Sequence, residues 1–305
     1  MKSLFLLFAL AATSAWAQQQ GLSGPTPGYV FDGQARELRP IRGVAGSAHL
    51  GSALVQDADA ASASADGTLA IASRFGSIEL IRGFDSAAPT RLTLAQEPGD
   101  VLFAWSGHDV AAVFPATRKV HLWRNVDTAS DQATALELPL VEGAIRSILL
   151  DGDRLVLATQ GGLYLATGGS IIRQLLALTD PSAVVRSGNH LFIADRAAGH
   201  IILLREYAGS AIAERFAGVA SPVGIQLTNG TLLVASADSR TVDAFDLTSK
   251  LRTASLELDF SPTRMESLGV NPLALLNTGS ATEPLYILDS RNALQVYFVP
   301  AGREQ

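Results

Sequence analysis

A turn dipeptide that ends in glycine comes before a short apolar segment at six places along the chain. The six pairs are Asp66-Gly67, Ser106-Gly107, Asp151-Gly152, Ser187-Gly188, Asn229-Gly230 and Thr278-Gly279. Their glycines are 40, 45, 36, 42 and 49 residues apart, a mean period of about 42. A tight hairpin needs positive φ, which glycine adopts without steric cost. The spacing therefore predicts one such hairpin and several short strands in each repeat.

Repeats of this length are typical of a β-propeller, in which small sheets stack around an axis and cover one another's faces. The third repeat shows four candidate strands, at 145–150, 154–159, 162–167 and 171–178. We therefore expect an all-β fold, a β-propeller of four-stranded antiparallel blades. The six hairpin motifs favour six blades, whereas the additional segment 28–32 leaves seven possible.

The last repeat contains three candidate strands instead of four. Segment 37–43 precedes the first repeat and has no inner strand of its own. Exposed strand edges invite aggregation, and closure of the ring removes them. We therefore expect segment 37–43 to close the propeller as the fourth strand of the last blade.

The first 17 residues, MKSLFLLFALAATSAWA, have the three parts of an export signal. Lys2 supplies the positive start, an apolar run follows, and Ala15-Trp16-Ala17 fits the small-x-small cleavage pattern. The apolar run is too short to span a bilayer. We expect a signal peptide over residues 1–17, a flexible leader over 18–27 and a single propeller domain over 28–305. The mature protein is expected to be secreted or periplasmic, without membrane insertion.

Composition excludes several kinds of site. The chain has 305 residues, no cysteine and a net charge of −6. Disulfides, Cys-ligated zinc and iron–sulfur clusters are therefore impossible. The acidic balance argues against a nucleic-acid partner, which requires a basic surface. Nucleophile-elbow and phosphate-loop motifs are absent from the sequence, which favours a function without catalysis.

Residues 180–201 and 221–236 carry a family resemblance. Each has a proline at its second position, passes through a Gly-Asn or Asn-Gly turn, and continues into an apolar strand that ends in Ala-Asp or Ala-Ser. In these features the chain resembles the NHL-repeat propellers of the TolB-like group, which have six blades. Arg outnumbers Lys by 20 to 3, a bias that indicates a bacterial source. The resemblance implies an exported propeller, but propellers serve unrelated functions.

Alignment of the repeats on the turn glycine separates an apolar position from a more polar one nearer the channel. Candidate ligand contacts at the channel or its rim are Trp105, Arg186, Gln226, Thr228 and Asn277. Arg74 and Arg196 follow the next strand at equivalent positions, where two guanidinium groups could clamp a carboxylate or phosphate. The alternative is that the first set lines a wet channel and that the arginines are solvated loop residues.

Segments 56–59 and 151–153 place carboxylates two residues apart, as calcium loops do, but neither continues into a complete loop. The five histidines show no zinc-site spacing. We therefore predict no metal site and no cofactor, and keep calcium as an open possibility.

We interpret the chain as an exported, monomeric and non-enzymatic scaffold that binds a protein, peptide or glycan. The alternative, implied by the resemblance, is a calcium-dependent lactonase-like hydrolase with a metal in the central channel, approached by Asp180 and Glu266. A quinone-dependent dehydrogenase is a third option, for which only His108 and Arg186 offer a base and a cation.

Overall fold

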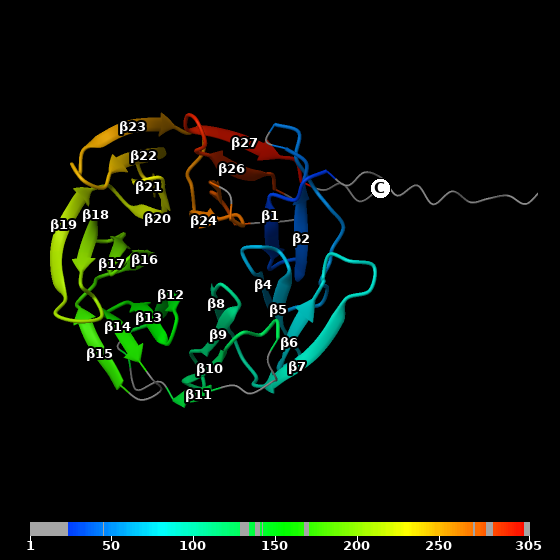
Figure 1. Cartoon of the computed structure of the whole chain (residues 1–305). Coiled ribbons are helices and arrows are strands. Elements are labelled where there is room, and N and C mark those ends of the chain that lie inside the picture. The colour runs from blue at the N-terminus through cyan, green and yellow to red at the C-terminus, as the bar shows by residue number, and fades with distance from the viewer. Residues whose placement is uncertain are drawn as a thin grey trace, which may run out of the picture.

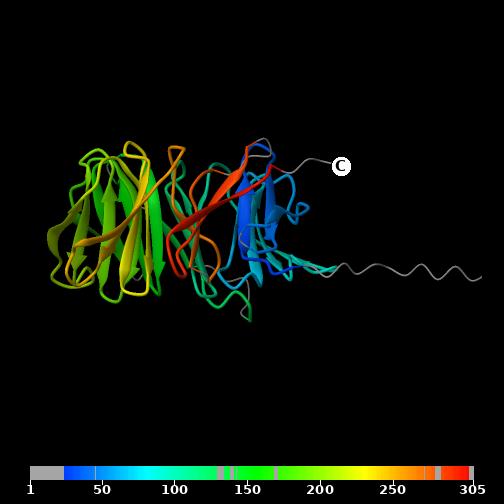
Figure 2. The same cartoon turned by 90° about the horizontal axis from the view of Figure 1, so that it is seen from above.

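The computed structural model describes residues 24–44, 46–128, 134–137, 141, 143–167, 171–270, 272–278 and 283–301. Within these residues the chain forms seven β-sheets that stand around a central axis (Figure 1). The fold is a β-propeller, and its strands run between the two faces of the ring (Figure 2). The favoured count of six blades is therefore wrong, and the alternative of seven is confirmed. The expected signal peptide, most of the expected leader and Gly279 lie outside the described residues.

Blade 1 has three strands, and blades 2 to 7 have four each. Blade 1 contains β1 (Gly28–Asp32), β2 (Glu37–Arg42) and β3 (His49–Leu50). Blade 2 contains β4 (Ala60–Ala63), β5 (Leu69–Arg74), β6 (Ser77–Arg82) and β7 (Thr90–Gln96), and blade 3 contains β8 (Leu102–Ser106), β9 (Asp109–Phe114), β10 (Lys119–Trp123) and β11 (Thr134–Glu137). Blade 4 contains β12 (Ile145–Asp151), β13 (Arg154–Thr159), β14 (Gly162–Thr167) and β15 (Ile171–Leu176).

The remaining blades follow the same antiparallel order from the axis outward. Blade 5 contains β16 (Pro181–Ser187), β17 (His190–Asp195), β18 (His200–Arg205) and β19 (Ile212–Gly218). Blade 6 contains β20 (Pro222–Thr228), β21 (Thr231–Ser236), β22 (Thr241–Asp246) and β23 (Arg252–Glu257), and blade 7 contains β24 (Glu266–Ser267), β25 (Leu273–Leu275), β26 (Leu285–Asp289) and β27 (Gln295–Val299). No helix among the described residues is long and apolar enough to cross a membrane.

The glycine motif marks the hairpin between the first and second strands of blades 2 to 6. All five of these glycines have positive φ, between 56° and 76°. The sequence-based explanation of the repeat is thus confirmed for the part of the motif that the structure describes. Positive φ is the conformation that tight hairpins require and that most side chains resist.

Apolar faces of neighbouring blades form the core. Between blades 5 and 6, for example, Phe192 meets Phe216 edge to face at 5.2 Å, and Phe216 meets Phe245 at 6.2 Å. Ile201 and Val234 are fully buried in the same cluster. Second strands read as nearly continuous apolar runs because both of their faces are covered by adjacent blades. Stacking of the repeats, rather than any single sheet, therefore makes the core.

The ring closes by packing of blade 1 against blade 7. Val30 and Ile41 share one buried cluster with Leu273, Leu275 and Ile287. The expected closure by segment 37–43 is wrong, because β2 pairs with β1 and β3, and β27 supplies the outer strand of blade 7. The short inner strand β24 was not recognised in the sequence. Blade 7 therefore draws all four strands from the C-terminal part of the chain and has no vacancy for an N-terminal strand.

Candidate binding cavity in the central channel

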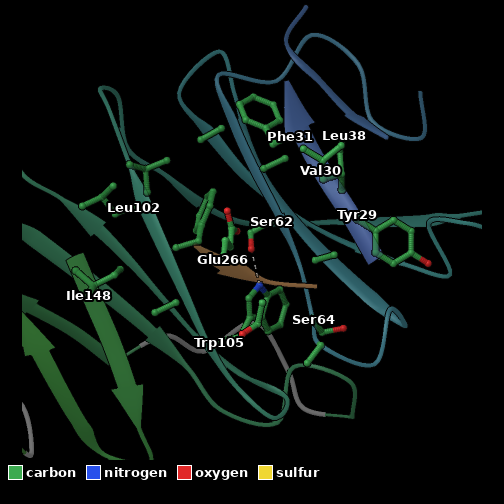
Figure 3. A pocket seen from close by; sticks show the side chains of 18 of the residues that line it. Tyr29, Val30, Phe31, Leu38, Ser62, Ser64, Leu102, Trp105, Ile148 and Glu266 are labelled. Atoms are coloured by element: carbon green, nitrogen blue, oxygen red, sulfur yellow. Dashed lines mark hydrogen bonds between the residues drawn. The ribbon is translucent and has the colours of Figure 1, made fainter. Parts of the chain in front are cut away.

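A cavity of about 690 Å³ occupies the central channel (Figure 3). Its wall is formed by β1, by the inner strands of blades 2, 3 and 4, and by the segment around β24. This volume lies within the range of small-molecule and peptide pockets. The inner strands of blades 2, 3 and 4 meet here because each of these blades directs its first strand toward the axis (Figure 1).

The wall combines apolar side chains, many of them small, with polar groups. All of β4 and the two residues that follow it line the cavity, and this segment is composed of alanine and serine alone. Opposite it, Trp105 of β8 donates a hydrogen bond from Nε1 to Oγ of Ser62 at 3.2 Å (Figure 3). The bond orients the indole and leaves its apolar surface as part of the wall. Such a surface favours ligands that present apolar groups together with a few hydrogen-bonding groups.

Blade 7 contributes an ion pair to the wall. Nη1 of Arg264 lies 2.7 Å from Oε2 of Glu266, and the Glu266 side chain is 60% exposed. Nε of Arg264 also donates to the carbonyl of Asn277 at 3.0 Å. Glu266 is the one carboxylate among the described residues that line the cavity. Of the two carboxylates considered for the channel, Glu266 therefore reaches this cavity, whereas Asp180 is paired with Arg196 and is not among the described lining residues.

A histidine joins the hairpins of blades 2 and 3. Nε2 of His108 lies 3.0 Å from Oδ2 of Asp66, and Nδ1 lies 2.9 Å from Oδ2 of Asp127. Hydrogen bonds to Asp66 and Asp127 raise the pKa of His108 above its usual value. Burial alone would raise the pKa of Asp66, but hydrogen bonds from Ser64 and His108 outweigh it and hold that pKa well below its usual range. A base poised for redox chemistry would need a free ring nitrogen, whereas both nitrogens of His108 are engaged.

The three candidate arginines lie apart and are paired with carboxylates. Arg196 bonds Oδ2 of Asp180 through Nε and Nη2 at 3.0 and 2.7 Å. Nε of Arg186 lies 3.2 Å from Oδ1 of Asp151. Arg74 lies 3.6 Å from Glu79 and 3.9 Å from Asp57.

Arg74 belongs to blade 2 and Arg196 to blade 5, so the structure does not bring these two guanidinium groups together into the clamp that we considered. Their charges are instead balanced within or next to their own blades.

Trp105 alone of the seven sequence-predicted ligand residues is among the described residues lining the cavity. Gln226 is buried between blades 6 and 7, where Nε2 donates to the carbonyl of Leu273 at 3.3 Å. Thr228 ends β20 opposite Thr231. Asn277 follows the second strand of blade 7, not the first, and its Oδ1 accepts a hydrogen bond from the backbone N–H of Tyr286 at 2.9 Å. Ligand roles for these residues stay predictions.

Three functional candidates were missed by sequence reasoning: Tyr29 and Phe31 of β1, and Ser62 of β4, all of which line the cavity. β1 has no glycine motif before it, so alignment on that motif passed over it. One signal was present in the sequence. Asp32 and Arg36 are four positions apart, as are Asp195 and Gly199 in the turn after the second strand β17. This shared spacing could have assigned β1 to the repeat.

Neither acidic segment forms a cation site in the described residues, where no group of three or more His, Asp or Glu side chains is placed to hold a metal ion. Asp59 is paired with Arg36 at 2.7 Å. Asp151 is held by Arg186, by Arg154 at 3.5 Å and by the hydroxyl of Tyr207. These carboxylates act in the structure as partners of arginines between strands and blades.

The fold and the channel cavity define the class, a seven-bladed β-propeller with a hollow centre. No protein-family model matches the sequence, and no curated protein matches it. The chain is similar in fold to apo AztD from Citrobacter koseri, with TM-score 0.58 and 13% identity over 87% of this chain and 92% of that one. It is also similar to the β-propeller domain of Cps50 (Swd1) from Myceliophteria thermophila, with TM-score 0.60 and 14% identity over 82% and 88% of the two chains.

A third similar structure comes from a nidogen/laminin complex, with TM-score 0.52 and 13% identity over 75% of this chain and 92% of that one. At these identities the likeness concerns the fold alone.

Proposed function

We propose that this protein is an exported, non-enzymatic scaffold that binds a ligand in the central cavity. The observation that carries the proposal is the cavity itself, in which apolar side chains lie beside Trp105, Ser62 and the Arg264–Glu266 pair. A wall of this kind can bind and orient a ligand. Nucleophilic catalysis would instead need an activated nucleophile beside a base, and the one carboxylate in the described wall is paired with an arginine.

The N-terminal sequence supports the proposed export. The pattern of the fourth and fifth repeats supports an NHL-like ancestry, which is part of the same proposal. The similar fold in the nidogen/laminin complex supports a protein or peptide as the ligand, because there a propeller is present in a complex with another protein. A glycan stays within the proposed ligand classes, since Trp105 offers a stacking surface.

Capture of ligands from an exported-protein fraction tests the proposal. Immobilised protein that begins at Gln18 is compared with Trp105→Ala, which removes an aromatic wall residue, and with Phe298→Ala, which removes a side chain 65% exposed on an outer strand. We expect the Trp105→Ala variant to lose captured ligand at least about tenfold and the Phe298→Ala control to retain it. Equal capture by all three proteins would contradict a binding site in the cavity.

The calcium-dependent hydrolase makes a different prediction. A ligand that binds only the folded state raises the melting temperature. We expect neither calcium chloride nor EDTA to change the Tm of the scaffold. A rise of several degrees with calcium, together with lactone turnover, would favour the hydrolase.

A further inference from the structure

Blade 1 begins at the second strand of the repeat. The last residues of β1, β17 and β21 are Asp32, Asp195 and Ser236, and all three are buried. In each, a side-chain oxygen accepts a hydrogen bond from the backbone N–H three residues later, at 3.0, 3.2 and 3.3 Å. The residue four positions later has positive φ in all three turns, 59°, 64° and 52°. The turn after β22, a third strand, has the same hydrogen bond and positive φ, but its Asp246 is not buried. The buried Asp32 therefore matches the second strands β17 and β21, and β1 lies farther from the axis than the inner strand β24 (Figure 1). We assign β1 to the second-strand position, so blade 1 lacks an inner strand among the described residues.

The chain before β1 does not turn back to fill that position over residues 24–27. The carbonyl of Pro25 accepts a hydrogen bond from the N–H of Gly43 at 2.9 Å. Nη1 of Arg42 donates to Oγ1 of Thr26 at 2.6 Å. Both contacts keep this segment beside the end of β2. Within the described residues, β1 pairs with β2 alone, so its second edge borders the cavity.

The hydrogen-bonding groups on this edge can be assigned from β2. Leu38 directs its N–H and C=O to Val55 and Leu54, and Pro40 directs its C=O to Gly51, all on the side away from β1. Phe31 and Tyr29 lie opposite Leu38 and Pro40. These are therefore non-hydrogen-bonded pairs of the antiparallel ladder. It follows that the N–H and C=O groups of Tyr29 and Phe31 point toward the cavity.

The burial of the β1 side chains also indicates a free edge. Tyr29 and Phe31 are only half-buried, whereas the central residues of the second strands in blades 2 to 7 are buried throughout. Ala61 and Ala63 of β4 pack in the same cluster as Tyr29 and Phe31 and line the same cavity. We call the space lined by these four residues the blade 1 gap. It is bordered by small and aromatic side chains. At one end the hydroxyl of Tyr29 donates to Asp85 at 3.4 Å, and Asp85 is paired with Arg42. The paired Arg264 and Glu266 line the same cavity on the blade 7 side.

We propose that the blade 1 gap receives an extended peptide segment of a partner protein, which adds to β1 as the inner strand of the blade. This inference rests on the proposed binding function and names its ligand class. Strand addition to a free edge gives affinity through main-chain hydrogen bonds and specificity through alternate side chains. A glycan cannot reproduce that ladder. The chain's own inner strands indicate the sequence that fits, five to seven uncharged or weakly charged residues that are small or apolar at alternate positions, as in β16 and β20.

Peptides copied from these inner strands are direct probes. Acetylated and amidated peptides with the sequences of Pro181–Ser187 and Pro222–Thr228 are titrated into full-length mature protein, and amide hydrogen exchange is followed residue by residue. Binding is expected to slow exchange at Tyr29 and Phe31 and to leave Val30, which already pairs with β2, unchanged. N-methylation at one alternate set of peptide amides should weaken binding by about tenfold or more, because two ladder hydrogen bonds are lost, and methylation at the other set should have much less effect.

A paired substitution provides the protein-side control. Ala61→Trp places a large side chain in the blade 1 gap and should abolish peptide binding, whereas Ala88→Trp, on an exposed loop, should not. If Ala61→Trp folds poorly, the methylated peptides test the same contact on the unaltered protein.

Three results would overturn the inference. Tyr29 and Phe31 amides that are protected before any peptide is added would mean that the chain itself or a second copy fills the gap. Equal loss of affinity for both methylated sets would rule out strand pairing. If a ligand is captured through Trp105 but leaves exchange of the Tyr29 and Phe31 amides unchanged, strand addition is disproved and the proposed binding function is retained. If no ligand is captured at all, the result counts against the proposed binding function.

Discussion

Nε2 of His108 lies 3.0 Å from Oδ2 of Asp66 and thereby links the first hairpin of blade 3 to that of blade 2. Asp127, 2.9 Å from the other ring nitrogen, completes a carboxylate–imidazolium–carboxylate contact. The contact lies between adjacent blades, where the stability of a stacked-repeat fold is decided by neighbour interfaces.

This contact should make stability depend on pH. The pKa of His108 is raised in the folded protein, so its contribution is complete below the unfolded pKa of about 6.5 and is lost as pH rises through the folded pKa. Between pH 6 and pH 9 the wild-type Tm should therefore fall more than that of His108→Gln. His200→Gln is the matched control, because His200 hydrogen bonds to the backbone carbonyl of Ala198. Parallel pH profiles for wild type and His108→Gln would refute the role of this contact.

The seam between blades 1 and 7 should be sensitive to core truncation. Ile41 is fully buried there. Ile41→Ala should lower the free energy of unfolding by about 2–5 kcal/mol, through lost burial and the cavity that remains. Ile212→Ala, at a side chain 62% exposed on β19, should cost under about 1 kcal/mol. Urea unfolding followed by tryptophan fluorescence measures both, and similar losses would mean that blades 1 and 7 do not close the ring.

The turn after β1 depends on Asp32. Its Oδ1 accepts hydrogen bonds from the N–H groups of Gln34 and Ala35 at 2.9 and 3.0 Å. Asp32→Ala removes both acceptor contacts and should destabilise the protein by about 1–3 kcal/mol. Asp32→Asn keeps an acceptor oxygen and should cost less. Equal losses in chemical denaturation for the two variants would show that the charge, not the turn, is what matters.

The pair formed by Arg196 and Asp180 should contribute little to stability. Although its geometry is good, the Arg196 side chain is 50% exposed, and solvent-exposed pairs contribute about 0–1 kcal/mol. Arg196→Ala should therefore change the free energy of unfolding by less than about 1 kcal/mol. Neither should it change ligand capture, since Arg196 lies away from the described cavity wall. A loss of capture without a loss of stability would restore the anion-clamp hypothesis.

The Tyr29 hydroxyl should lose its proton at a higher pH than an ordinary tyrosine does. Burial, followed by the nearby charge of Asp85, raises the pKa of Tyr29 to about 12. Ultraviolet titration of the phenolates should show one fewer high-pH transition in Tyr29→Phe than in wild type. If the lost transition lies near the usual value of about 10, Tyr29 is solvated and the gap beside β1 is wider than the structure indicates.

The sequence predicted blades 2 to 6 but not the composition of blades 1 and 7. The glycine motif works because hairpins of blades 2 to 6 all need positive φ at one residue, as at Gly188 and Gly230. Blade 1 has no such hairpin because it has no described inner strand, so it escaped the count. In blade 7 the first strand is only Glu266–Ser267, too short to show alternation, and β25 was taken as the first strand in its place. Both errors led to six blades and a closing strand.

The binding site was harder to predict than the fold. Trp105 was found because alignment of the repeats on the turn glycine placed it at the position expected to face the channel. The pairing of Arg186 with Asp151 and of Arg196 with Asp180 brings together residues more than 15 positions apart, and no local pattern encodes such pairs. In the sequence, Tyr29 and Phe31 are ordinary strand residues. They become candidates because, within the part of the chain that the structure describes, β1 has no strand on its second edge.

Amide exchange in the free mature protein tests the central structural claim, a free strand edge inside the ring, most directly. Tyr29 and Phe31 should exchange orders of magnitude faster than Val30, which lies between them and pairs with Arg39 of β2. Equal protection of all three amides would mean that a strand already lies against β1 and that the propeller has no open blade to offer a ligand.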